Sequence, residues 1–276
     1  MRIKMNKNLN SPLFLRVMKN PLSNNYRILS MIMGVASLLI LLAGGRAQAQ
    51  TAPPYTNDIF LDNKTYTFLI FDRLEYTGIS GPDPLVWDAQ GWIGKDFHKF
   101  WFKTEGDVLT SEKEGEMELQ GLYSRAITSF FDLQAGLRYD LAYNAVDNNS
   151  RGFAVIGIQG LAPYLFEVDG ALFVSDAGDI SASLEAEYDM PITQRLWGQP
   201  RLETSLAVQE VEQWGVGSGL NNVRLGFRLR YEIRREFAPY VGISWNRQLG
   251  ETADFVRDEG GDPSTFGLVG GVRMWF

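Results

Sequence analysis

Residues 224–232 read RLGFRLRYE, and this stretch decides the fold class. Every odd-numbered position from Leu225 to Tyr231 is apolar, and every even-numbered position except Gly226 carries a charge. Successive side chains of a β-strand point to opposite faces, so a strand here has one apolar face and one charged face. The same alternation recurs in residues 132–140, 181–188 and 201–206.

The length of these alternating segments favours a membrane barrel over a soluble β-sandwich. They run for about 10 to 13 residues, whereas strands of globular proteins are typically about 5 or 6 residues long. A tilted transmembrane strand needs about 9 to 11 residues. Several apolar faces end in an aromatic side chain, as at Tyr139, Tyr188 and Tyr231, which is typical of the aromatic girdle at a lipid boundary. We therefore expect an all-β protein, a transmembrane antiparallel up-and-down β-barrel with a polar, charged lumen.

The pattern predicts about twelve strands, with ten as the fallback count. The predicted strands cover residues 65–76, 85–94, 97–108, 115–126, 130–142, 151–160, 163–174, 179–190, 195–208, 221–234, 236–248 and 264–276. Short and long connections alternate between them, as in outer-membrane barrels, where the short turns are periplasmic. An even count places both chain ends of the barrel on the periplasmic side. The last strand ends in Phe276, which resembles the C-terminal signal of bacterial outer-membrane barrels.

The first 49 residues form a separate unit. They hold seven basic residues and no acidic one, and an apolar run from Ile28 to Gly45 precedes Ala47-Gln48-Ala49. This order is typical of a secretory signal peptide, so we expect cleavage before Gln50, with an uncleaved membrane anchor as the alternative. The predicted organisation is a signal peptide at 1–49, a short periplasmic segment at 50–64 and an outer-membrane barrel at 65–276.

The composition excludes several classes of function. The chain has no cysteine and one histidine, His98, so thiolate sites and histidine clusters for zinc are absent. No Ser-His-Asp set is placed for catalysis, and we expect no enzyme. From residue 50 onward the 33 acidic residues outnumber 19 basic ones, for a net charge of −14. Such a surface repels nucleic acid and attracts cations.

In the predicted strands, many ionisable residues occupy the alternate positions whose side chains point into the lumen, which we call the inward parity. They are Lys103, Glu105, Glu118, Asp132, Arg138, Asp140, Glu167, Asp169, Glu185, Glu187, Arg201, Glu203, Arg224, Arg228, Arg230, Glu232 and Arg273. Two interpretations stay open: a salt-bridge network that fills the lumen, and a cation path or metal site.

Several stretches are more specific than a generic barrel pattern. They are FDRLEY at 71–76, WDAQGWIG at 87–94, LYSRAI at 122–127, DLQAG at 132–136, GLAPY at 160–164, LEAEYD at 184–189 and RLRYEIRREFAPYVG at 228–242. Together they resemble the copper resistance protein B family, outer-membrane proteins of copper-resistance operons. The resemblance runs from about residue 58 to the C-terminus.

The resemblance implies a barrel in the bacterial outer membrane that contributes to copper homeostasis beside a periplasmic multicopper oxidase. Its implied partners are copper ions, outer-membrane lipid and that oxidase. Members often carry a segment rich in Met and His before the barrel, and this chain departs from that pattern. Between Gln50 and Thr65 there is neither residue, so a thioether-rich trap for Cu(I) is missing.

Six residues are the candidate copper ligands, namely His98, Met117, Glu105, Glu118, Glu167 and Glu187. The four glutamates share the inward parity, and carboxylates with imidazole can accept Cu(II). His98 has the parity of Phe100 and Phe102, which favours a lipid-facing girdle position, and Met117 shares its parity with Leu119.

Two functional hypotheses from different classes remain. The first is a metal-homeostasis barrel that exports or sequesters copper with periplasmic partners. The second is a general pore-type or structural barrel without direct metal binding.

Overall fold

A computed structural model describes residues 64–78, 84–109, 114–143, 148–258 and 260–276, and the predicted signal peptide lies outside them. The strands are β1 (Tyr66–Gly78), β2 (Pro84–Gly94), β3 (His98–Leu109), β4 (Glu114–Ala126), β5 (Phe131–Tyr143), β6 (Asn148–Ala162), β7 (Phe166–Ser175), β8 (Ile180–Tyr188), β9 (Met190–Pro191), β10 (Leu196–Ala207), β11 (Gly219–Tyr231), β12 (Phe237–Gln248) and β13 (Ser264–Trp275). Short 3₁₀ turns η1 (Pro163–Leu165) and η2 (Glu212–Trp214) and one helix, α2 (Gly250–Asp258), complete the described elements.

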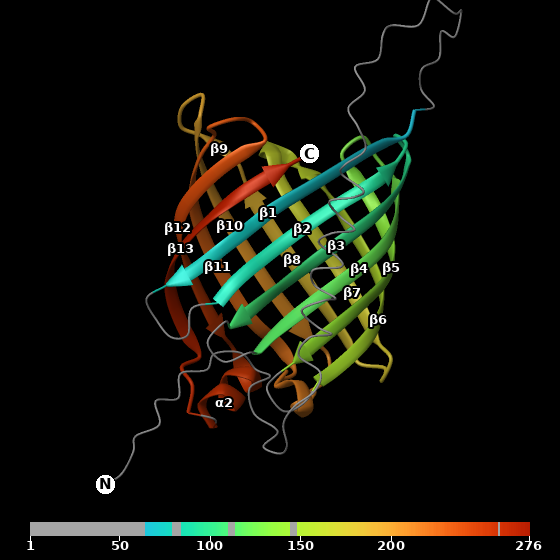
Figure 1. Cartoon of the computed structure of the whole chain (residues 1–276). Helices are drawn as coiled ribbons and strands as arrows, with labels where there is room; N and C mark the ends of the chain where they lie inside the picture. Colours follow the sequence, from blue (N-terminus) through green and yellow to red (C-terminus); the bar gives the residue numbers. More distant parts are fainter. Residues whose placement is uncertain (1–63, 79–83, 110–113, 144–147, 259) are drawn as a thin grey trace, which may run out of the picture.

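The strands close into one antiparallel barrel (Figure 1). Neighbours in the chain are neighbours in the sheet, β1 pairs with β13, and β10 pairs with β11. The short β9 continues β8 along the same edge of β10, so the barrel has twelve strand positions. This confirms the predicted fold and the strand count of twelve.

Both ends of the barrel wall meet at one rim. The backbone N–H of Leu69 donates to the carbonyl of Phe276, and the N–H of Phe276 donates to the carbonyl of Leu69. The short turns lie at this same rim, and α2 lies at the opposite one (Figure 1). Short turns mark the periplasmic side of such barrels, so the rim with Phe276 is periplasmic and the end with α2 is extracellular.

One predicted strand start is wrong, and one long connection between strands contains a helix that was not predicted. Residues 163–165 were expected to begin a strand, but they form the turn η1, in which Tyr164 and Leu165 have φ values of 68° and 67°. The predicted loop 249–263 contains the helix α2, whose Thr252, Ala253 and Val256 are buried. No helix in the described part of the chain is long and apolar enough to cross a membrane.

The helix α2 ties two extracellular loops together. The backbone N–H of Gly217 donates to Oγ1 of Thr252 at 2.9 Å. Ser218 donates from its backbone N–H and from its hydroxyl to Oε2 of Glu251, each at 2.8 Å, and these hydrogen bonds lower the pKa of Glu251. The loop before β11 and the loop after β12 are therefore held as one unit at this mouth.

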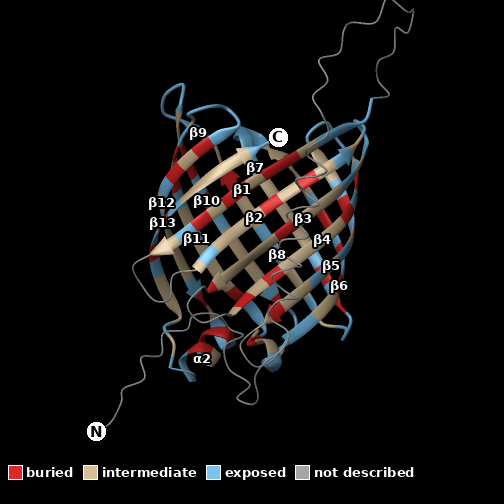
Figure 2. Cartoon of the chain, viewed as in Figure 1, coloured by how far each residue is buried: buried red, intermediate tan, exposed pale blue. Residues whose placement is uncertain are grey.

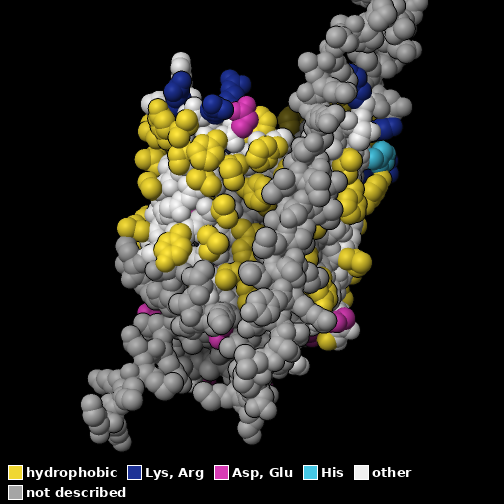
Figure 3. Space-filling view, viewed as in Figure 1, with side chains coloured by type: hydrophobic (Ala, Val, Ile, Leu, Met, Phe, Trp, Pro, Cys, Tyr) yellow, Lys and Arg dark blue, Asp and Glu magenta, His cyan; other side chains and the backbone are white. Residues whose placement is uncertain are grey.

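The wall has an apolar outside and a polar inside. Exposed side chains on the outward parity include Leu137 at 70% and Val241 at 64% of full exposure, whereas Arg201 and Arg228 are 5% and 4% exposed. Exposed and covered positions alternate along the strands in Figure 2, and many hydrophobic side chains lie on the parts of the outer wall that Figure 3 shows. Apolar exposure on this scale fits a surface in contact with lipid rather than water.

Candidate functional site

Strand β1 carries a bulge that sends two successive charged side chains into the lumen. Its register with β13 shifts between Phe71 and Leu74, so Asp72 and Arg73 together lie opposite the single residue Arg273. In such a bulge the alternation of side chains is interrupted. Both side chains are buried, at 8% and 1% exposure, and both border the lumen cavity.

Arg201 of β10 is the centre of the lumen network. Its guanidinium lies close to five carboxylates, with ion-pair distances of 3.1 Å to Asp72, 3.1 Å to Asp88, 2.7 Å to Glu185, 3.5 Å to Glu187 and 2.7 Å to Glu203. Its side chain is 3% exposed. A single arginine thus contacts acids from β1, β2, β8 and β10.

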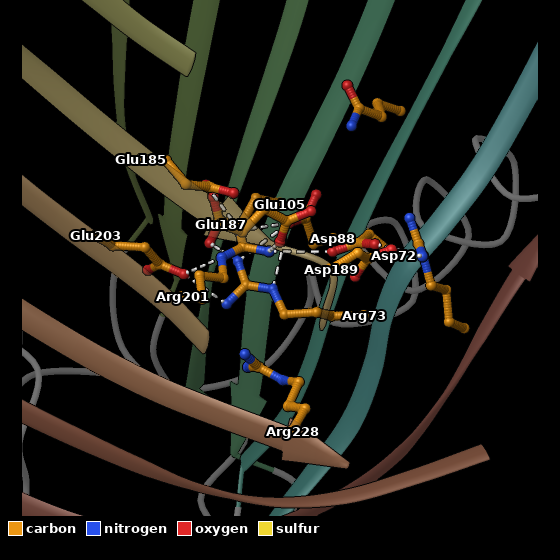
Figure 4. A network of polar contacts seen from close by, with 12 residues as sticks. Asp72, Arg73, Asp88, Glu105, Glu185, Glu187, Asp189, Arg201, Glu203 and Arg228 are labelled. Atoms are coloured by element: carbon orange, nitrogen blue, oxygen red, sulfur yellow. Dashed lines mark hydrogen bonds and ion pairs between the residues drawn. The ribbon is translucent and has the colours of Figure 1, made fainter. Parts of the chain in front are cut away.

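Arg73 of β1 completes this centre from the other side. Its side chain is 2% exposed and lies 3.1 Å from Asp88, 2.8 Å from Glu105 and 3.0 Å from Glu203. Two arginines therefore share Asp88 and Glu203, as Figure 4 shows. We call these two arginines with Asp72, Asp88, Glu105, Glu185, Glu187 and Glu203 the Arg73–Arg201 network.

Two further groups of ion pairs flank the network. Arg228 donates from Nε and from one terminal nitrogen to the two oxygens of Glu75, each at 2.9 Å, and the Tyr240 hydroxyl donates to Glu75 at 3.0 Å. Arg273 lies 2.7 Å from Asp72 and 3.6 Å from Asp189, which also accepts from Arg230 at 2.7 Å.

The pairing of strands β2 to β5 places carboxylates next to one another, and the lumen arginines offset their repulsion. Asp88 lies directly opposite Glu105, Glu105 opposite Glu118, and Glu118 opposite Asp140, across β2 to β5. Directly opposed like charges destabilise a sheet. Arginines that reach these rows, such as Arg73 and Arg138, offset that repulsion.

A cavity of about 1210 Å³ occupies the lumen beside the network. Its lining runs from Phe130 and Leu161 near the periplasmic turns to Thr77 and Leu109 at the extracellular strand ends. Side chains also bridge the lumen: Lys103 of β3 pairs with Asp169 of β7, and Gln159 of β6 donates to Gln90 of β2 at 3.3 Å. The interior is therefore a cavity with a polar lining that polar side-chain bridges cross.

The four candidate glutamates all face the cavity, as their parity predicted. The structure does not gather them into one site. Glu105 and Glu187 belong to the Arg73–Arg201 network, whereas Glu118 lies 2.7 Å from Arg138. Among the described residues, no group of three or more His, Cys, Asp or Glu side chains is placed to hold a metal ion.

The two candidate ligands with softer donor atoms, His98 and Met117, lie apart from the candidate glutamates. His98 is exposed at the start of β3, with Nδ1 2.5 Å from the Tyr123 hydroxyl on the outer wall. Met117 is buried and borders the cavity, although the alternation of β4 places it on the face opposite to Glu116 and Glu118. Within the described part of the chain, the imidazole of His98 and the thioether of Met117 therefore do not form a common site.

The parity analysis missed Asp72, Arg73, Glu75 and Asp88 in the lumen and wrongly included Glu232. The last residue lies in the turn after β11, where its backbone N–H donates to the carbonyl of Arg195. One signal for β1 is present in the sequence. Two charged residues, Asp72 and Arg73, stand side by side between the apolar run 68–71 and the alternating Leu74-Glu75-Tyr76, and this break in the alternation falls at the bulge.

A closed barrel with an apolar outer belt and an ion-paired lumen defines a β-barrel protein of the bacterial outer membrane. Residues 65–276 match the family model described as Copper resistance protein B precursor. The chain belongs to this family, which gives it a role in copper resistance.

Two relatives cover most of the chain. A Copper resistance protein B homolog of Pseudomonas syringae pv. tomato and Copper resistance protein B of Escherichia coli are each 39% identical over 215 residues, which is 78% of this chain and 71% of each relative.

Solved structures are more distant. A KdgM porin shares 10% identity, with a TM-score of 0.43 over 76% of this chain and 99% of its own. An anion-selective porin from Comamonas acidovorans shares 12% identity, with a TM-score of 0.31 over 77% of this chain and 99% of its own. The fold assignment rests on the strand pairing described above and not on these scores.

Proposed function

We propose that this barrel protects the cell by passing copper ions outward across the outer membrane through its lumen, together with periplasmic copper-handling proteins such as a multicopper oxidase. The observation that carries the proposal is the charge of the cavity wall. Among the described residues, fifteen carboxylates and nine basic side chains border the cavity. A low-dielectric wall with excess negative charge concentrates cations inside a pore.

The side chains of the lumen fit the passage of copper ions better than their tight storage. Each carboxylate of the Arg73–Arg201 network already contacts an arginine, and Glu118 contacts Arg138. A metal ion that binds there must therefore displace a strong partner. Cu(I) prefers thioether and thiolate ligands, and from residue 50 onward the chain offers Met117, Met190 and Met274 and no cysteine. A cargo that binds weakly at several points can leave again, as conduction requires.

The competing proposal is a general or structural barrel with no direct contact with copper. The cross-lumen bridges favour it, because Lys103–Asp169 and Gln159–Gln90 narrow the interior. Conductance and copper tolerance, measured together, separate the two proposals.

We expect the purified barrel to conduct cations in preference to anions in a planar bilayer. Glu118→Gln should reduce that preference, since it removes a charge from the cavity wall. Glu210→Gln, an exposed loop variant outside the cavity lining, is the control and should leave the reversal potential unchanged. In cells, deletion of the gene should raise periplasmic copper and lower tolerance. A deletion strain with normal tolerance and lower periplasmic copper would contradict outward passage.

Copper titration should give weak binding to the purified barrel. Any Cu(II) affinity should come from inward carboxylates such as Glu105, Glu118, Glu167 and Glu187, and it should weaken as pH falls because protonation removes the ligand charge. Separate isothermal titrations with Cu(I) and Cu(II) measure this. Tight stoichiometric Cu(I) binding that is abolished by His98→Ala or Met117→Ala would show a storage site and overturn the passage proposal.

A further inference from the structure

The periplasmic ends of β3 and β4 carry a polar cluster on the outer wall. His98 is exposed, with its ring stacked on Tyr123 at a centroid distance of 5.9 Å and its Nδ1 2.5 Å from the Tyr123 hydroxyl. In the tautomer with the proton on Nε2, the hydroxyl donates to Nδ1 and the Nε2–H stays available to a further acceptor. The strand register places Arg125 directly opposite His98.

The depth of this cluster in the membrane follows from the neighbouring residue pair. Phe100 lies opposite Tyr123, and the two side chains are 54% and 53% exposed on the outer wall. Exposed aromatic pairs at this level mark the edge of the hydrocarbon layer. His98 and Arg125 form the next pair toward the periplasmic rim, which is the depth of lipid phosphates. Figure 3 shows the histidine at the edge of the hydrophobic surface, beside Lys and Arg side chains.

Arg125 differs from the arginines of the lumen. Arg73, Arg138 and Arg201 are each held by carboxylates, and the adjacent inward Lys99 pairs with Asp132 at 2.8 Å. Arg125 is exposed and has no ion pair among the described residues. A guanidinium at the lipid boundary therefore faces outward with its donors available.

We propose that Arg125, His98 and Tyr123 form a binding site for the phosphate group of an anionic phospholipid in the periplasmic leaflet. The guanidinium fork matches two phosphate oxygens, and the imidazole Nε2–H supplies a third donor. The exposed faces of Phe100 and Tyr123 lie where the first carbons of the acyl chains would pack. This assigns His98 to lipid rather than to copper.

The test uses the whole mature protein in a neutral detergent with short-chain phosphatidylglycerol as the probe. Native mass spectrometry should show one saturable lipid adduct. Arg125→Gln should weaken its binding at least about tenfold, which corresponds to the loss of one charge-assisted contact. Arg125→Lys should retain part of the affinity, and His98→Gln should lower it several-fold. Arg235→Gln, an exposed arginine of the turn after β11, is the matched control and should bind normally.

Two outcomes would overturn the site. Equal phosphatidylglycerol binding by the unmodified protein and Arg125→Gln would show that these residues do not hold the lipid. Equal affinity for inorganic phosphate, with no gain from the acyl chains, would assign the cluster to a free anion instead. Folding of each variant is checked by the heat-dependent gel shift of intact barrels, so a lost adduct can be separated from a lost fold.

Discussion

Replacing Arg201 with methionine is expected to destabilise the folded barrel by about 3–5 kcal/mol, because it leaves buried carboxylates without their shared cation. Asp72, Asp88, Glu185, Glu187 and Glu203 all lie within 3.5 Å of this guanidinium. The methionine side chain fills similar space but cannot offset their mutual repulsion. Of these five acids, only Asp88 and Glu203 also contact Arg73, so Glu185 loses its ion pair with an arginine.

Reversible urea unfolding in lipid vesicles, followed by tryptophan fluorescence, measures this loss. Arg224→Met is the matched control, since Arg224 is also a lumen arginine but is 37% exposed, and among the described residues its one ion pair is with Glu203. Its effect should stay below about 1 kcal/mol, as for solvent-exposed ion pairs. Equal losses for the two variants would show that the Arg73–Arg201 network is not the main stabilising element of the lumen.

The sequence predicts the barrel wall well because alternation is a local property of each strand. The segments 115–126, 130–142 and 236–248 differ from β4, β5 and β12 by one residue at most at each end. Lipid outside and charge inside impose this pattern on each residue pair separately. The helix α2 follows no such rule, and its burial depends on contacts with the loop at Gly217 and Ser218.

The lumen site could be predicted only in part. Parity places Arg201, Glu185 and Glu203 inside, but it cannot say that one guanidinium reaches acids from four strands. That depends on barrel diameter and on the bulge at Asp72 and Arg73, which brings a second arginine inward. The candidate glutamates face the lumen as expected. What argues against a tight metal site is the short distance of Glu105, Glu118 and Glu187 to an arginine, which the alternation of the strands does not predict.

The alternation of side chains along each strand also makes a strong prediction for the outer wall. Leu137 lies near the middle of β5, opposite Gly121 and Ala154, and is 70% exposed. Leu137→Arg should destabilise the folded barrel by about 2–4 kcal/mol, because a charge at the bilayer midplane loses its hydration. Leu137→Ala measures the loss of the leucine side chain alone and should cost much less.

The cost of an outward arginine should depend on its depth in the membrane. Ile127 is 50% exposed in the periplasmic turn after β4, at the level of the headgroups. Ile127→Arg should change the free energy of unfolding by about 0–1 kcal/mol, since an arginine there stays hydrated and lies close to lipid phosphates. Guanidinium unfolding of both variants in phospholipid vesicles gives the comparison. Equal destabilisation at the two positions would mean that the wall around Leu137 does not face hydrocarbon, and the transmembrane placement of β5 would then be wrong.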